Sequence, residues 1–228
     1  MSLFSTMSVV AAVVIVAGFG NTYVPKVVSG SESIPSIVHL HAAVFTAWLA
    51  LFITQTMLVM RGQIKRHQQL GTAAMALAAL MLVVGTMTAV NAARLGHRGI
   101  PGVEFPDVEG FLLLNINATI VFAVLIGAGW WFRGKPEVHK RLMLMATVGA
   151  LMPPGISRLP FVSGHTPAIA LAVIAFLLVG PVHDLITRRR IHPAYLCGLV
   201  VAVLAFPPVA AALSTLPAWH RAAAWLIG

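Results

Sequence analysis

Three histidines occupy the same kind of position in the sequence, each at the end of a short basic turn and at the start of a long apolar stretch. They are His67, His139 and His192. If the three apolar stretches are helices that run in one direction, their first turns lie at one depth and the histidines can meet. The partial positive charge of a helix amino terminus disfavours imidazolium, so we expect neutral rings, the form that binds metal ions. The pattern therefore predicts a shared metal site.

An acidic residue is available to complete that site. Asp184 ends the apolar stretch before the last basic turn, next to His183. We expect it to be a fourth ligand or the base that orients a metal-bound water, and Glu137 is a weaker candidate. Three imidazoles with a carboxylate or water suit zinc, and two imidazoles with a carboxylate suit iron(II). The predicted metal ligands are His67, His139, His183, Asp184 and His192.

The activity expected of such a site depends on the metal. A zinc-bound water of near-neutral pKa hydrolyses esters or amides, and an iron site oxidises its substrate. Asp184 and Arg141 are the predicted catalytic residues, and Arg141 with Arg66 would hold an anionic headgroup. The sequence thus predicts a metal-dependent hydrolase or oxidase that acts on a lipid-like substrate at the cytoplasmic face.

Other functions remain open. A non-catalytic accessory or assembly subunit of a membrane complex fits the same residues, because a histidine beside a membrane is most often solvated or faces headgroups. Met143, Met145 and Met152 suggest copper(I), although methionine in an apolar helix usually fills space. The main alternative is a b-type haem protein of electron transfer, which would take its axial ligands from His41, His67, His139 and His192.

The composition is that of a membrane protein. Hydrophobic residues make up 59% of the 228 residues, charged residues 9%, and the mean hydropathy is +0.91. Soluble proteins carry about a quarter charged residues, so we expect an all-α bundle in a bacterial inner membrane. The net charge of +9 comes from Lys and Arg in short loops, which indicates orientation in the membrane and no nucleic-acid partner. Cys197 is the only cysteine, which excludes a disulfide framework.

Seven apolar stretches predict seven transmembrane helices in a single domain, 1–228. They are 3–23, 37–60, 69–93, 111–132, 141–162, 167–187 and 194–214, followed by an interfacial amphipathic tail at 217–228. The basic loops are expected inside, which places the amino terminus inside and the carboxyl terminus outside. Two proline pairs, Pro153-Pro154 and Pro207-Pro208, are expected to break the fifth and seventh helices where these face protein or a cavity.

Polar residues also gather on the opposite side of the membrane. His39 and His41 open the second apolar stretch, and residues two apart on a helix point about 200° from each other. We therefore expect His41 alone to face the bundle, with Trp48 and Gln55 following on that face. Arg158 needs a partner near the outer interface, and the candidates are Glu104, Asp107 and Glu109.

Several of these segments resemble a bacterial family of small seven-helix membrane proteins of unassigned function. The segments are His39-Leu-His41 with Trp48 and Gln55, His67-Gln-Gln-Leu-Gly, His139-Lys-Arg-Leu-Met, Arg158, and Asp184 with His192-Pro. The chain is more distantly similar to the ceramidase and adiponectin-receptor superfamily, which implies zinc hydrolysis of lipid amides. It lacks the pair of histidines four residues apart that this superfamily carries in its last helix.

Overall fold

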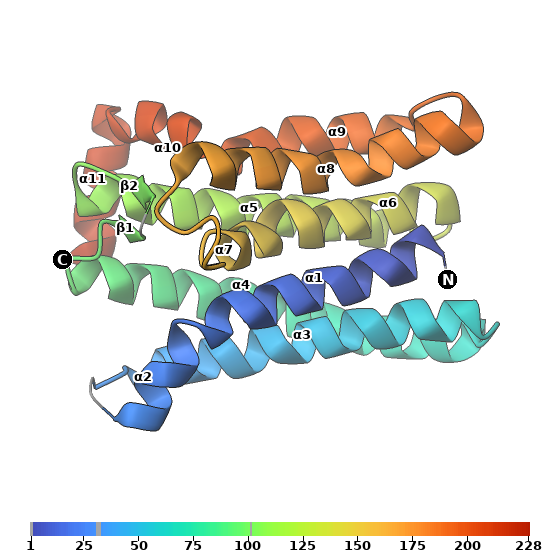
Figure 1. The fold of residues 1–228 in the computed structure, drawn as a ribbon, viewed down its shortest axis with the longest axis horizontal. Helices are drawn as coiled ribbons and strands as arrows, with labels where there is room; N and C mark the ends of the chain where they lie inside the picture. Colours follow the sequence, from blue (N-terminus) through green and yellow to red (C-terminus); the bar gives the residue numbers. More distant parts are fainter. Residues whose placement is uncertain (1, 31–32, 101) are drawn as a thin grey trace.

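The computed structural model describes residues 2–30, 33–100 and 102–228; most of them form helices, and the long helices run along one common direction (Figure 1). The long helices are α1 (Leu3–Gly20), α3 (Ser36–Met60), α4 (Ile64–Arg94), α5 (Val108–Trp131) and α8 (Thr166–Arg188). These five are long and apolar enough to cross a membrane. The remaining elements are α2 (Tyr23–Ser29), β1 (Gly99–Ile100), β2 (Val103–Glu104), α6 (Pro136–Ala146), η1 (Thr147–Leu151), α7 (Met152–Ile156), α9 (Pro193–Ala202), η2 (Val203–Ala205), α10 (Pro207–Ser214) and α11 (Pro217–Ile227).

The expected all-α membrane bundle is confirmed, whereas the expected count of seven spans is not. Residues 193–205 and α10 form a bent pair with an angle of 53°, which raises the described candidates to six. The segment expected to be the fifth span, 141–162, is divided into α6, η1 and α7 and ends at Ile156. It is therefore shorter at its carboxyl end than the apolar stretch suggested.

Both proline pairs interrupt helices, as expected. Pro153 and Pro154 have no N–H to donate, so the carbonyls one turn earlier lose their usual partners. The backbone responds with the π-helical turn η1, in which the Met152 N–H donates to the Thr147 carbonyl. Pro207 begins α10 after an extended residue, Phe206, and this produces the bend in the last span.

Helix α7, which follows the π-helical turn, packs closely on α1 through two glycines. A Cβ atom on Gly18 would lie 2.1 Å from the Gly155 carbonyl oxygen, and one on Gly155 would lie 2.8 Å from the Ile15 Cα. Such close approach of backbones through small residues is typical of helix packing in membranes. It fixes α1 against the interrupted segment.

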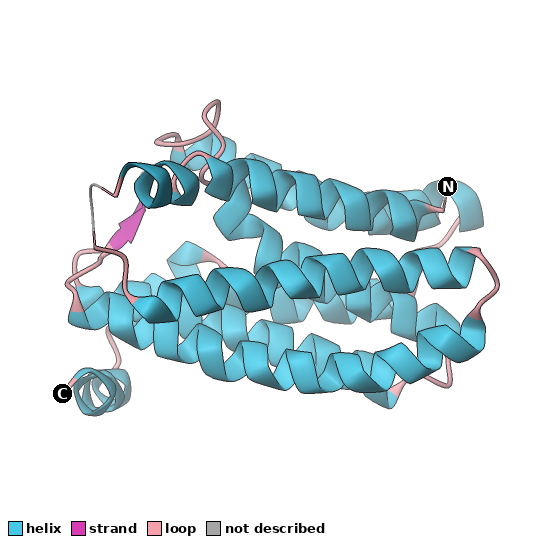
Figure 2. Ribbon diagram, turned by 90° about the horizontal axis from the view of Figure 1, so that it is seen from below, coloured by secondary structure: helices cyan, strands magenta, loops and turns pink. Residues whose placement is uncertain are grey.

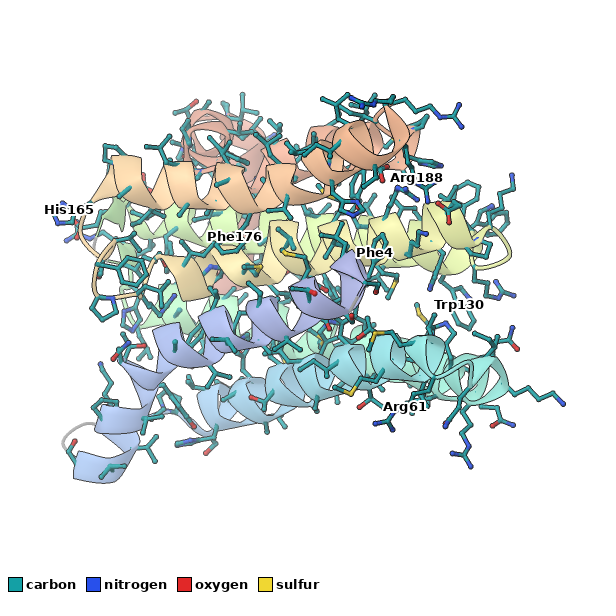
Figure 3. The ribbon with its side chains drawn as sticks, turned by 45° about the vertical axis from the view of Figure 1, so that its right-hand side comes forward. Phe4, Arg61, Trp130, His165, Phe176 and Arg188 are labelled. Carbon is teal, nitrogen blue, oxygen red and sulfur yellow. The ribbon has the colours of Figure 1, made fainter. Side chains whose placement is uncertain are left out.

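The three basic turns lie at one end of the bundle, together with the amino terminus (Figure 1). We call this the basic end; it comprises the turns 61–63, 132–135 and 189–192. Figure 3 shows Arg61, Trp130 and Arg188 there and His165 at the opposite end. The β1–β2 hairpin, α2 and the carboxyl terminus also lie at the opposite end (Figure 1).

The tail forms α11, which is seen end-on in Figure 2 and so lies across the direction of the long helices. The Trp219 indole donates a hydrogen bond to the Glu109 carbonyl, 3.1 Å away. Arg94 donates to the carbonyl oxygens of Ile227 and Leu226, the last turn of α11. Trp225 is exposed, as expected for a helix at a membrane interface.

Candidate functional site

The most buried charged residues of the basic end are Arg141 on α6 and Asp184 on α8. Their side chains are 1% and 2% exposed. Arg141 Nε donates to Asp184 Oδ2 at 2.8 Å, and Nη2 donates to Oδ1 at 2.7 Å. This two-bonded geometry is the strongest form of the arginine–carboxylate pair. It joins α6 to α8 inside the bundle.

Glu137, one turn before Arg141, connects this pair to the solvated surface. Arg141 Nη1 donates to the Glu137 carbonyl at 2.7 Å and to its Oε2 at 2.8 Å. Lys140 and Arg188 also pair with the Glu137 carboxylate. Hydrogen bonds from Lys140 and then from Arg141 lower the pKa of Glu137, which lies ahead of the apolar stretch, to about 2. Both acids of this cluster are already paired with basic side chains.

Tyr195 and His192 bring α9 to the same cluster. The Tyr195 ring lies beside the Arg141 guanidinium, 5.4 Å from ring centroid to Cζ. Gly180 makes room for that ring, since a Cβ at this position would lie 2.5 Å from it. His192 caps α9, with its Nδ1 accepting a hydrogen bond from the Ala194 N–H at 3.1 Å. Burial, and then the charge of Arg141, lowers the pKa of His192.

His67 and His139 form a separate pair between α4 and α6. Their ring centroids lie 6.1 Å apart, with an angle of 75° between the planes. The His139 Nδ1 lies 2.8 Å from the Gly129 carbonyl oxygen. Because a carbonyl only accepts, this nitrogen carries the proton and Nε2 keeps a free lone pair. One ring of the pair is thus oriented with a nitrogen available to a ligand.

Gln55 on α3 lies next to the histidine pair. Its backbone carbonyl faces the His67 ring, and its Nε2 lies 3.4 Å from the position of a Cβ on Gly71. The buried Gln55 Oε1 and His67 Nδ1 find no hydrogen-bond partner among the described residues. One nitrogen of the pair and one oxygen beside it can therefore still bind a ligand or water.

The structure does not bring the expected ligands together as one group. Within residues 2–30, 33–100 and 102–228, no three side chains of His, Cys, Asp or Glu are placed to hold a metal ion. His67 and His139 are neighbours, but Asp184 and His192 belong to the Arg141 cluster. The physical reason is that Arg141 occupies both oxygens of Asp184. His183, the remaining candidate ligand, has a buried Nδ1 that no described residue contacts by a hydrogen bond.

Two arginines, Arg66 and Arg141, were expected to bind the headgroup of a substrate, and they differ in their exposure. Arg141 is buried and ties helices together, so its guanidinium is not presented to a lipid headgroup. Arg66 is exposed and donates to the Gln63 side chain at 3.1 Å. Of the two arginines, Arg66 alone is accessible from the surface.

At the opposite end, His41 faces the bundle and His39 is exposed, as expected. His41 stacks on Phe45 with centroids 3.9 Å apart, and its buried Nδ1 has no partner among the described residues. His39 pairs with the Tyr23 hydroxyl.

Arg158 does not make the expected ion pair with a residue of the acidic loop. In the described part of the chain its Nη1 donates to the Pro154 carbonyl at 2.7 Å, and its Cζ lies 4.5 Å from the Phe19 ring centroid. Glu109 pairs with His220 instead, and Asp107 caps α5. Two of the three candidate acids are thus used by other elements.

Sequence reasoning missed Glu137 as the centre of the ion-pair cluster, and it missed Tyr195 altogether. The spacing of Glu137 with Lys140 and Arg141, three and four residues on, is a signal for ion pairs on one helix face. Tyr195 has no comparable signal, since an aromatic residue in an apolar helix usually packs in the core.

The chain was also compared with known proteins. No protein-family model matches the sequence, and no characterised protein or solved structure matches it. The two resemblances noted above therefore remain predictions, and the function has to be argued from the site itself.

Proposed function

We propose that this chain crosses a bacterial inner membrane seven times, with its amino terminus inside, and holds a copper ion between His67 and His139 at the cytoplasmic end. Residues 136–156 are helical throughout, about 30 Å at 1.5 Å per residue, which is long enough for one crossing whose first turn, with Glu137, stays at the headgroup level. The bent pair in 193–214 supplies the last crossing. The amino terminus lies at the basic end (Figure 1), and basic turns mark the cytoplasmic side.

The observation that carries the metal proposal is the spacing of the two histidine rings. Two imidazoles that each give one nitrogen to the same ion, at a metal–nitrogen distance of about 2.0 Å, have centroids about 5–6.5 Å apart. The centroids of His67 and His139 lie 6.1 Å apart. The Gly129 carbonyl orients His139, in the way that partners behind metal-bound histidines usually do.

The types of ligand at this site favour copper over zinc or iron(II). A catalytic zinc site takes three imidazole or carboxylate ligands, and the iron(II) site takes two imidazoles and a carboxylate. The acids nearest the site, Glu137 and Asp184, are engaged by Arg141. Imidazole and thioether ligands suit copper, and Met143 lies one turn after His139, with its Sδ packed against Gly129. His67, His139 and Met143 are the proposed ligands.

Haem fits this pair less well than a single ion. A porphyrin needs a cradle of small residues on either side of its iron. The space above Gly71 is filled by the Gln55 amide, and the space above Gly129 is filled by the Met143 side chain. When bound, a copper ion at this position supplies one-electron chemistry. The protein residues hold and orient it, and a hydrophobic substrate or a membrane partner would reach it from the bilayer.

Metal analysis of purified variants tests the proposal. Wild-type protein should carry about one copper per chain after growth with copper, His67→Ala and His139→Ala should lose it, and Met143→Leu should bind it more weakly. His192→Ala is the matched control, because it removes a histidine of the same end that belongs to the Arg141 cluster. Loss of metal in His192→Ala but not in His139→Ala would contradict the assignment. A Soret band in the spectrum would restore the haem alternative.

Orientation is tested separately by fusing a reporter that is active only in the cytoplasm to each terminus. The amino-terminal fusion should be active and the carboxyl-terminal fusion inactive. The reverse result would place the basic end outside.

A further inference from the structure

A groove lies at the end of the bundle opposite the basic end, between the start of α3 and the last turns of α4. Its volume is about 280 Å³, and it is lined by Ile37, Thr86, Met87, Val90, Asn91 and Arg94. The five residues of α4 recur at intervals of three or four, so they form one face of that helix over about 12 Å. We call this the α4 groove.

The walls of the α4 groove are mostly apolar and reach the surface of the bundle. Ile37, Met87 and Val90 supply them, and Met87 is 54% exposed. Pockets that enclose a small molecule have about 300–1,000 Å³, so an elongated ligand can lie only partly inside this groove. Because lipid tails are as apolar as these walls, the walls accept a lipid chain but do not select among lipids.

Arg94, the last residue of α4, brings a positive charge to one end of the α4 groove. Its Nε and Nη2 donate to the carbonyl oxygens of Ile227 and Leu226, at 2.9 and 3.1 Å. Carbonyl oxygens carry no net charge, and none of the described acidic residues pairs with Arg94. Helix α11 therefore holds the guanidinium in place without supplying a counter-ion.

Asn91, one turn before Arg94, adds an amide to the same end. The side chains of Asn21, Asn115 and Asn117 each donate to a backbone carbonyl. The Asn91 side chain lines the groove and makes no hydrogen bond within the described residues. The groove thus combines apolar walls with a cation and a hydrogen-bond donor at one end, which is the chemistry that an anionic amphiphile requires.

The polar end of the α4 groove lies at the depth expected for lipid headgroups. Helix α11 lies across the long helices at this end (Figure 2), and it carries Trp219 and Trp225, a residue type that prefers the membrane interface. Arg94 contacts the last turn of α11, and an arginine at the end of a membrane helix extends toward the headgroups. A ligand in the groove would therefore have its polar group at the interface and its chain in the bilayer.

We infer that the α4 groove binds one anionic phospholipid from the leaflet at this end. The lipid phosphate pairs with Arg94, and the Asn91 amide, about 4.5 Å deeper along the helix, donates to an ester carbonyl. Part of one acyl chain lies along Met87 and Val90. This inference rests on the membrane crossing proposed above, but not on the copper ion or on which end is cytoplasmic.

Quenching of an attached fluorophore by brominated lipids identifies the occupant. Cys197, the only cysteine, is changed to Ser, and bimane is attached to Val83→Cys, one turn below the groove, or to Leu178→Cys on α8. Both native side chains are exposed, and both lie roughly 17 Å from the ends of their helices on this side. Leu178→Cys is thus a control at equal depth, away from the groove.

The expected result is a lipid preference at one position only. In vesicles of phosphatidylcholine, a small fraction of brominated phosphatidylglycerol should quench the Val83→Cys label about fivefold more effectively than the same fraction of brominated phosphatidylcholine. The two brominated lipids should quench the Leu178→Cys label equally. Equal quenching of the Val83→Cys label by both lipids would overturn the inference.

Two substitutions of Arg94 separate its charge from its contact with α11. Arg94→Gln should abolish the preference for phosphatidylglycerol, whereas Arg94→Lys keeps the charge without the two hydrogen bonds and should retain it. Arg98→Gln is the matched control, because Arg98 is an exposed arginine of the same end that lies outside the groove. Loss of the preference in both Arg94 variants, or its survival in Arg94→Gln, would contradict binding by charge.

Glycerol phosphate in the aqueous phase distinguishes a lipid from a soluble phosphate compound. An excess of it should leave the quenching unchanged, because it has no acyl chain to occupy the apolar walls. Relief of the quenching would assign the groove to a soluble ligand and overturn the lipid assignment.

This proposal and the preceding one fail separately. If no brominated lipid quenches either label, the membrane crossing itself is wrong. If both labels are quenched but the Val83→Cys label shows no preference, only the lipid site is wrong. Copper content is measured on its own and depends on neither result.

Discussion

Arg141 and Asp184 join α6 to α8 through two parallel hydrogen bonds, although each side chain is almost completely buried. This pair explains why Asp184 is not available to the histidines of the same end. It also explains why the basic end contains two clusters, one of ion pairs and one of imidazoles. Because the pair is fully formed, its removal should affect stability more than metal binding.

Breaking the Arg141–Asp184 pair from one side should destabilise the protein strongly. Arg141→Met leaves an unpaired carboxylate in the bundle, and Asp184→Leu leaves an unpaired guanidinium, each at a cost of about 3–5 kcal/mol. The double variant leaves neither charge and should be less destabilised than either single variant. Unfolding by denaturant in detergent micelles measures this, and additive effects in the double variant would contradict the pairing.

Glu137 should give a pH-dependent contribution to stability. Its folded-state pKa of about 2 is below the ordinary value of 4.5, so its stabilisation is fully present above pH 4.5 and is lost as the pH falls toward 2. The side chain is 46% exposed, so we expect under about 1 kcal/mol, and less at high salt. Wild type should unfold later than Glu137→Gln at pH 6, and the difference should shrink below pH 4.5. A constant difference down to pH 3 would exclude this role.

The contact between α1 and α7 should depend on Gly18. A Cβ at this position would lie 2.1 Å from the Gly155 carbonyl oxygen, so Gly18→Ala should separate the helices and cost about 1–3 kcal/mol. Gly20→Ala is the matched control, since a Cβ there meets nothing within 4 Å. Thermal unfolding of the two variants should differ. Equal unfolding temperatures would show that the helices are not in close contact.

Much of this arrangement along the membrane normal could be predicted from the sequence. Apolar stretches and basic turns indicate where helices begin, and His67, His139 and His192 all occur within a turn of a helix start at the basic end. Seven-residue spacing also indicated that Trp48 and Gln55 follow His41 on one face. These are properties of single helices, which hydropathy and helical periodicity report directly.

Which helices are neighbours could not be predicted in the same way. Hydropathy places a residue at a depth but does not say which helix it faces, so three histidines at one depth appeared equally able to meet. The deciding contacts are between helices: Arg141 with Asp184, and His139 with the Gly129 carbonyl. The division of the fifth span into α6, η1 and α7 likewise depends on how the backbone adapts to two prolines.

X-ray absorption at the copper edge of the purified, copper-loaded protein tests whether His67 and His139 bind the ion. We expect histidine nitrogens among the nearest ligands at about 2.0 Å in wild type and in His192→Ala, and no bound copper in His139→Ala. A spectrum with no imidazole contribution, or one that is identical in wild type and His139→Ala, would contradict a copper centre at His67 and His139.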